Sequence, residues 1–289
     1  MRPLLSLAVC LLFVLPARAA DDKIVVALKP DKDPEKMLSE RTVLADFLSK
    51  KLGQPAEVIV PLSSAVIIEG LANGTIDLGY LSATDMLNAR KAKAGSLLLA
   101  GEIDGKTSYT SYWVTLKEKP YKDITELKGR PVAFASRTST SGYLIPMRDL
   151  SQRGLLSGSG DAESFFGKGN VIFGTGYVSA IERVFAGEAE AAAVSYYVLD
   201  QDKYLNAEQR AKLRVLQSQG PVPTHVIAVA AALPEDRKAA LKAALLSLND
   251  PASTTLRDQL FTSKLVETDE AAHLAPVEEA LKVVGAEKP

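Results

Sequence analysis

The chain has 289 residues, of which 34 are Lys or Arg and 35 are Asp or Glu, so its formal net charge is −1. This balance leaves no positive excess to neutralise a nucleic acid or an anionic lipid surface, and we exclude both as partners. The length exceeds that of a typical single domain, and we expect two compact units.

The first residues have the three-part layout of a secretory signal peptide. Arg2 supplies the positive charge, residues 4–15 form an almost unbroken apolar run, and Ala17-Arg18-Ala19 supplies the small-x-small cleavage pattern. A buried N-terminal helix would explain the apolar run but not the cleavage pattern. We therefore predict that residues 1–19 are a signal peptide and that the mature protein lies in the periplasm. Cleavage removes Cys10, the only cysteine, and with it any disulfide or thiol chemistry.

Beyond the signal, short apolar runs alternate with amphipathic stretches. The runs predict strands at Ile24–Leu28, Ala56–Val60, Ile76–Leu81, Tyr109–Leu116, Val132–Ala135, Val171–Gly174, Ala191–Ser195 and Val226–Ala231. Helical spacing predicts helices at Glu35–Lys51, Ala65–Leu71, from about Tyr143, and at Ser179–Ala186, Glu235–Leu248 and Pro276–Val284. Strands that alternate with helices form βαβ units, so we expect an α/β fold with mostly parallel sheets flanked by helices.

The strand and helix pattern falls into two sets and then returns, which predicts two lobes. We assign residues 20–108 and 217–289 to a discontinuous lobe 1, and residues 109–216 to lobe 2, including the hinge segments. Tyr109–Thr115 and Leu213–Leu216 are the candidate crossovers between the lobes.

The most informative segment is a strand that runs into the turn Ser139-Thr140-Ser141-Gly142 and then into a helix. The first N–H groups of a helix lack internal partners and attract anions, and three neighbouring hydroxyls add further donors. An ordinary helix cap needs only one such hydroxyl, and that reading stays open. A second Gly-rich turn, Phe173-Gly174-Thr175-Gly176-Tyr177, fits either a helix-start contact with a ligand or a plain turn.

Enzyme chemistry has little support in the sequence. The chain has two histidines. His225 flanks an apolar run and is read as structural, and His273 lies in an acidic, Ala-rich stretch and is expected to be exposed. No Gly-x-Ser-x-Gly elbow and no metal-ligand spacing is present, so we predict no catalytic residue, no metal and no cofactor.

These residues resemble those of the phosphate, phosphite and phosphonate-binding proteins of ABC importers, which have the type II periplasmic binding protein fold. The resemblance spans about residues 24–248. Its pieces are Ala27–Lys36, the unit Gly70-Leu71-Ala72-Asn73-Gly74-Thr75-Ile76-Asp77-Leu78-Gly79-Tyr80, the segment from Leu127 to Pro146, and Ala180–Ala193. In that family the Ser-Thr-Ser turn grips the oxyanion, which implies this role for Ser139, Thr140 and Ser141.

At three positions the chain departs from the family pattern. Ser64 stands where the family usually has an aromatic residue, Tyr177 where it has a histidine, and Ser195 where it has a carboxylate. The resemblance thus implies neutral hydroxyl donors at these positions. We expect Tyr177 and Ser195 to bind the solute from lobe 2, and Ser64 and Ser82 from lobe 1.

The sequence therefore predicts a monomeric solute-binding protein that holds a small oxyanion in the interlobe cleft and delivers it to an ABC permease in the inner membrane. The alternative is a periplasmic ligand sensor that feeds a membrane sensor kinase or chemoreceptor. The sequence leaves the identity of the solute open.

Overall fold

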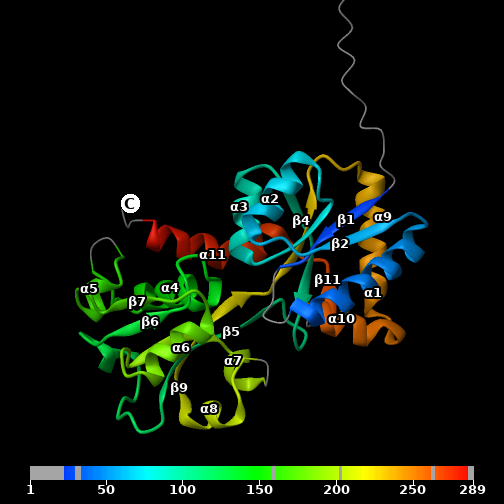
Figure 1. The fold of residues 1–289 in the computed structure, drawn as a ribbon. Helices are drawn as coiled ribbons and strands as arrows, with labels where there is room; N and C mark the ends of the chain where they lie inside the picture. Colours follow the sequence, from blue (N-terminus) through cyan, green and yellow to red (C-terminus); the bar gives the residue numbers. More distant parts are fainter. Residues whose placement is uncertain (1–22, 30–33, 158–159, 202–203, 262–263, 286–289) are drawn as a thin grey trace, which may run out of the picture.

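The computed structural model of the chain describes residues 23–29, 34–157, 160–201, 204–261 and 264–285. The predicted signal peptide lies outside these residues. The described chain forms two α/β lobes, and each contains one sheet with helices packed against it (Figure 1). Among the described residues, no helix combines the length and hydrophobicity that crossing a bilayer requires.

The first lobe is built on a six-stranded sheet in the order β11-β4-β10-β3-β1-β2. Its strands are β1 (Ile24–Ala27), β2 (Ala56–Ile59), β3 (Leu78–Leu81), β4 (Gly95–Glu102), β10 (Val226–Ala230) and β11 (Lys264–Val266). Its helices are α1 (Pro34–Leu52), α2 (Ser64–Asn73), α3 (Ala83–Lys91), α9 (Glu235–Leu246) and α10 (Thr254–Phe261). Apolar side chains of β1 and β3, such as Ile24 and Leu78, are fully buried in the core.

The second lobe has a five-stranded sheet in the order β7-β6-β8-β5-β9. Its strands are β5 (Ser108–Leu116), β6 (Val132–Phe134), β7 (Val171–Phe173), β8 (Ala191–Ser195) and β9 (Leu213–Pro223). Its helices are α4 (Ile145–Gln152), α5 (Glu163–Phe166), α6 (Tyr177–Phe185), α7 (Tyr197–Asp200) and α8 (Ala207–Lys212). The rings of Trp113, Phe134 and Phe166 pack together in its core.

The two-lobed α/β fold class is confirmed, but both sheets are mixed rather than mostly parallel. In the first sheet β1 runs parallel to β2 and β3, while β10 runs antiparallel to β3 and β4. In the second sheet β6 runs parallel to β7 and β8, while β5 runs antiparallel to β8 and β9. The antiparallel strands include β5, β9 and β10, by which the chain leaves one lobe and returns, and also β11, which runs antiparallel to β4.

The strands β5 and β9 form the long antiparallel pair that connects the lobes (Figure 1). Strand β9 stays in the second sheet until Pro223, beyond the boundary at residue 216 that the sequence predicted. After β10, the chain builds α9 and α10 on the first lobe.

The C-terminal helix α11 (Glu270–Val284) contacts both lobes. It packs against α3 of the first lobe and against α4 and β9 of the second. Arg90 of α3 pairs with Glu278, and Arg148 of α4 pairs with Glu279 at 2.6 Å. The helix begins at Glu270, not at the predicted Pro276. Asp269 is its N-cap residue, because its side chain accepts a hydrogen bond from the N–H of Ala272.

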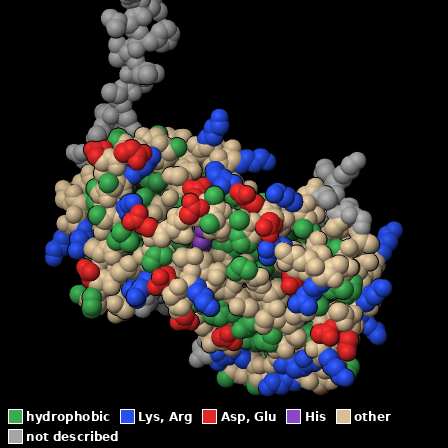
Figure 2. Space-filling model, turned by 180° about the vertical axis from the view of Figure 1, so that it is seen from behind, with side chains coloured by type: hydrophobic (Ala, Val, Ile, Leu, Met, Phe, Trp, Pro, Cys, Tyr) green, Lys and Arg blue, Asp and Glu red, His purple; other side chains and the backbone are tan. Residues whose placement is uncertain are grey.

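His273 lies on α11 and is buried, so the expectation that it is exposed is wrong. Its Nε2 lies 3.1 Å from the carbonyl oxygen of Thr224. Burial lowers the pKa of His273, and the contact with Thr224 opposes this change. On the outer surface, Lys and Arg side chains are mixed with Asp and Glu, as Figure 2 shows for one face. This mixture agrees with the nearly neutral composition.

Candidate functional site

The serine-rich turn after β6 forms the start of a helix. Ser139 precedes a π-helical turn, Thr140–Leu144, which continues directly into α4. The side chain of Ser139 accepts a hydrogen bond from the N–H of Gly142 at 3.0 Å, and its carbonyl accepts one from Leu144 at 3.0 Å. The N–H groups of Thr140 and Ser141 come before this first intrahelical bond. Such groups carry a partial positive charge that attracts anions. We call residues 139–142 the cradle.

Gly142 allows the cradle to lie against the end of β6. A Cβ atom at this position would lie 2.4 Å from the Cβ of Ala135 and 3.1 Å from Cε1 of Tyr177. Both distances are shorter than ordinary van der Waals contact. Only glycine therefore fits the observed approach of the helix start to the strand.

Beside the cradle lies a group of hydroxyls from three elements of lobe 2. The Oγ of Ser141 and the hydroxyl of Tyr177 are 2.6 Å apart. Ser195, at the end of β8, is fully buried, and its Oγ makes no hydrogen bond of ordinary geometry within the described residues. A buried hydroxyl that has lost its hydration without a well-formed hydrogen bond in return is available to a bound ligand.

Tyr109, which the sequence predicts only as part of a strand, belongs to the same group. Desolvation raises the pKa of its hydroxyl, Tyr177 adds to the rise, and the nearby hydroxyls of Ser141 and Ser195 oppose it. The phenol is consequently a neutral donor at physiological pH. Further tyrosine rings continue this wall of lobe 2, and the centroid of Tyr197 lies 5.7 Å from that of Tyr177.

A buried chain of hydrogen bonds connects the cradle to strands β5 and β9. Ser111 of β5 donates its hydroxyl to the carbonyl oxygen of Ser141 at 2.6 Å. Gln219 of β9 donates its Nε2 hydrogen to Ser111 Oγ at 2.8 Å. The two connecting strands therefore fix the position of Ser141.

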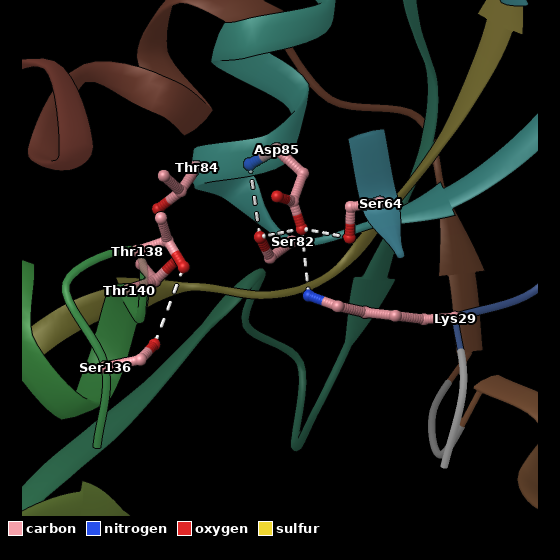
Figure 3. Close-up of polar contacts among 8 residues, drawn as sticks. All are labelled: Lys29, Ser64, Ser82, Thr84, Asp85, Ser136, Thr138 and Thr140. Atoms are coloured by element: carbon pink, nitrogen blue, oxygen red, sulfur yellow. Dashed lines mark hydrogen bonds and ion pairs between the residues drawn. The ribbon is translucent and has the colours of Figure 1, made fainter. Parts of the chain in front are cut away.

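On lobe 1, four residues form a polar network that faces the cradle (Figure 3). The ammonium of Lys29 lies 2.8 Å from Asp85 Oδ2. The same oxygen accepts hydrogen bonds from Ser64 at 2.9 Å and from Ser82 at 2.7 Å. Ser82 also caps α3, because its Oγ accepts the N–H of Asp85 at 3.1 Å. Both predicted lobe 1 residues thus direct their hydroxyl hydrogens to one carboxylate.

The charge of Asp85 is set by these neighbours. Burial alone raises the pKa of this carboxyl. The ammonium of Lys29 and the hydrogen bonds from Lys29, Ser82 and Ser64 outweigh burial, so the pKa lies below its usual value. The network therefore carries one positive and one negative charge at neutral pH.

Thr84 joins the two halves of the site. Its hydroxyl lies 2.7 Å from that of Thr140, so a residue of α3 in lobe 1 contacts the cradle of lobe 2 (Figure 3). Both threonines are buried.

The structure brings Ser139, Thr140, Ser141, Tyr177 and Ser195 together on lobe 2, and Ser64 and Ser82 together on lobe 1. Their role in binding stays a prediction. Sequence reasoning missed four residues of this neighbourhood, which are Lys29, Thr84, Asp85 and Tyr109. A usable signal existed for two of them, because Ser82-Ala83-Thr84-Asp85 follows a strand and has the Ser-x-x-Asp form of a helix start.

The second Gly-rich turn uses its donors internally. The N–H groups of Thr175 and Gly176 donate to Ser179 Oγ at 2.8 and 3.1 Å. It acts as a structural turn at the start of α6. In the part of the chain that the structure describes, no group of three or more His, Asp or Glu residues is arranged to hold a metal ion.

Solved structures of other proteins share this fold. XAC2383 from Xanthomonas citri bound to ATP has a TM-score of 0.76 and 17% sequence identity, over 92% of this chain and 100% of that one. PhnD1 from Prochlorococcus marinus in complex with methylphosphonate has a TM-score of 0.74 and 19% identity, over 92% and 99%. The periplasmic aliphatic sulphonate binding protein SsuA from Escherichia coli has a TM-score of 0.60 and 17% identity, over 93% and 84%. At these identities the likeness shows the fold, that of type II periplasmic binding proteins.

Sequence comparison identifies the family. The chain is 23% identical over 181 residues to the phosphate-import protein PhnD of Mycolicibacterium smegmatis, covering 61% of this chain and 56% of that protein. It is 23% identical over 192 residues to the probable ABC transporter phosphite binding protein PhnD1 of Prochlorococcus marinus, covering 64% and 62%. The match thus spans less than two thirds of either relative. The family model described as "ABC transporter, phosphonate, periplasmic substrate-binding protein" matches residues 26–273. The chain therefore belongs to the family of periplasmic substrate-binding proteins of phosphonate ABC transporters.

Proposed function

We propose that this protein is the solute-binding component of an ABC importer and that it holds a small oxyanion of the phosphate or phosphonate type between its lobes. The observation that carries the proposal is the cradle. The helix start, with the N–H groups of Thr140 and Ser141, packs against β8, whose last residue, Ser195, has a buried hydroxyl without a hydrogen bond of ordinary geometry among the described residues. An anion with several oxygens can accept hydrogen bonds from several such donors at once.

Each predicted residue has a place in this proposal. Ser139 positions the helix start through its bond to Gly142, and Thr140 and Ser141 offer their N–H groups. Ser141 also offers its hydroxyl, which lies 2.6 Å from that of Tyr177. Tyr177 and Ser195 supply neutral hydroxyls to the remaining oxygens. No step changes a covalent bond, so the protein binds and releases its solute unchanged.

The family context sets the partner and the compartment. Members of the family are periplasmic, so we propose that residues 1–19 direct export and are then removed. The closed form, with lobes in contact at Thr84 and Thr140, would be the form presented to the membrane permease. The mass of the mature protein purified from the periplasm tests the cleavage, and a mass that retains residues 1–19 would contradict it.

Isothermal titration calorimetry with inorganic phosphate, phosphite, methylphosphonate and sulfate tests the proposed binding. We expect the wild-type protein to bind at least one of them. Ser141→Ala should weaken that binding by about tenfold or more, because it removes a hydroxyl from a buried anion site. Ser151→Ala, near the far end of α4, is the matched control and should bind like the wild type. Absence of binding to all four anions would refute the proposed ligand class.

A further inference from the structure

One ammonium group lies where three parallel strands of lobe 1 end. Lys29 follows the end of β1, Ser64 begins the helix after β2, and Ser82 caps the helix after β3. Strand β1 lies between β3 and β2, so Lys29 projects from the centre of this edge. The carboxyl ends of parallel strands are where open α/β sheets bind ligands.

The ammonium is only partly engaged. Lys29 has 37% of its side-chain surface exposed, against 13% for Asp85. An ammonium has three donors, and within the described residues its contact is with Oδ2 of Asp85. Donors therefore remain for a further acceptor on the side that faces the cradle (Figure 3).

The carboxylate does not depend on Lys29 alone. Ser64 and Ser82 donate to the same oxygen of Asp85, and they stay in place if the ammonium turns toward another anion. Asp85 also neighbours Thr84, which touches Thr140 of the cradle. An oxyanion on the cradle would thus meet Lys29 and Asp85 directly across from it.

We propose that Lys29 is the charged ligand-binding residue of lobe 1, and that Asp85 competes with the bound oxyanion for its ammonium. This inference rests on the proposed function, because it assigns the lobe 1 contact of the same ligand. The cradle supplies neutral donors, and Lys29 supplies the positive charge that meets the anion when the lobes close.

The two charges predict opposite effects on affinity. Removing Lys29 leaves Asp85 facing the anion and weakens binding. Removing the charge of Asp85 takes away both the competitor and a repelling charge, so binding tightens. A pair that only held the fold together would lower stability in both variants and leave affinity unchanged.

The test is calorimetry of Lys29→Met, Lys29→Arg and Asp85→Asn with inorganic phosphate, phosphite and methylphosphonate at neutral pH and low ionic strength. We expect Lys29→Met to weaken binding about tenfold to a hundredfold, the usual effect of losing a charge-assisted hydrogen bond. Lys29→Arg should stay within a few fold of the wild type, and Asp85→Asn should bind more tightly.

Lys23→Met is the matched control. Lys23 pairs with Glu57 in the same lobe, and both side chains are about half exposed, with 47% and 48% of their surface accessible. This variant should bind as the wild type does.

The outcomes separate the two proposals. If the wild type binds and Lys29→Met binds equally well, the assignment of Lys29 is wrong while the proposed function stands. Weaker binding by Asp85→Asn refutes the competition. If the wild type binds neither these three anions nor sulfate, both proposals fall. Should Asp85→Asn fail to fold, the pair Lys29→Met and Lys29→Arg still decides the role of the ammonium.

Discussion

The hydroxyls of Thr84 and Thr140 lie 2.7 Å apart and form a direct hydrogen bond between the two lobes. Thr84 is in the first turn of α3, and Thr140 begins the helix that carries the cradle. The contact joins the lobes in the arrangement that the structure shows, and it adds to the stability of that arrangement.

Replacing Thr84 by Val should shift the protein toward an open form. Valine keeps the shape of the side chain but cannot bond to Thr140, and one buried neutral hydrogen bond is worth about 1 kcal/mol, or about fivefold in the equilibrium between the forms. Small-angle X-ray scattering should show a larger radius of gyration than for the wild type. Thr255→Val, on the exposed surface of α10, is the control. An unchanged radius would mean that this bond does not influence closure.

Replacing Gly142 by Ala should displace the cradle. The added Cβ would lie 2.4 Å from the Cβ of Ala135, and overpacking of this kind costs about 1–3 kcal/mol. We expect a lower midpoint of urea unfolding and weaker binding of whichever oxyanion the wild type binds.

Two further variants control this prediction. Gly176→Ala has no atom within 4 Å of the new Cβ and an extended backbone, so it should be nearly neutral. Ala135→Gly combined with Gly142→Ala removes the shortest of these contacts, that with the Cβ of Ala135, and should restore part of the stability. Equal stability of Gly142→Ala and Gly176→Ala would show that the close approach is not limiting.

Replacing Ser111 by Ala should destabilise the protein and also weaken ligand binding. The change leaves the Nε2 hydrogen of Gln219 without its acceptor and Ser141 without its support, and an unsatisfied buried group costs about 1–3 kcal/mol. Urea unfolding and calorimetry measure the two effects. Ser108→Ala, at the half-buried start of the same strand, should change neither. A variant with lower stability and normal affinity would limit Ser111 to a structural role.

The stability of the folded protein should fall as the pH drops below about 6.5, the usual pKa of histidine, and His273 contributes to this fall. Its pKa in the folded state lies below the value of 6.5 expected for an exposed imidazole, since burial disfavours the charged form. Below pH 6.5 the unfolded chain therefore binds more protons than the folded protein. The contribution of neutral His273 to stability is thus complete above pH 6.5 and is lost as the pH falls through the lower pKa of the folded state. Thermal melts of the wild type at about pH 7.5 and about pH 5.5 should show this loss.

His273→Gln is the matching variant. Glutamine does not titrate and can still donate an N–H to the carbonyl oxygen of Thr224. Its melting temperature should fall less than that of the wild type over the same pH interval. An equal fall in both proteins would assign the pH dependence to other groups.

The sequence predicts the fold class and the position of the Ser139–Gly142 turn at a helix start, because both depend on local patterns. Strands such as Ile24–Ala27 and Ala191–Ser195 are short apolar runs, and the Ser139–Gly142 turn is contiguous. The local sequence pattern does not indicate helix α3 or strand β4. In α3 nearly every side chain of the first turns is buried, including Thr84 and Met86, so the helix lacks the one-sided pattern on which detection depends.

Other features depend on contacts between residues that are distant in the sequence. Lys29 and Asp85 are 56 positions apart, and no local signal links them. The burial of His273 depends on Thr224, 49 positions earlier, which lies where the chain returns to lobe 1. The antiparallel neighbours in both sheets have the same origin, because the order of strands follows from how the chain returns between lobes rather than from the composition of any strand.

The contacts of α11 with both lobes restrict the geometry of opening. The strands β5 and β9 and the return into β10 connect the lobes covalently. Helix α11 adds a further connection, because Arg90 of lobe 1 and Arg148 of lobe 2 both form ion pairs with it. A rotation that keeps both ion pairs must have its axis close to α11, in the way that a door turns about its hinged edge. Points far from α11 then move furthest, so a pair of fluorophores placed there, one on each lobe, should report solute binding with the largest change in distance.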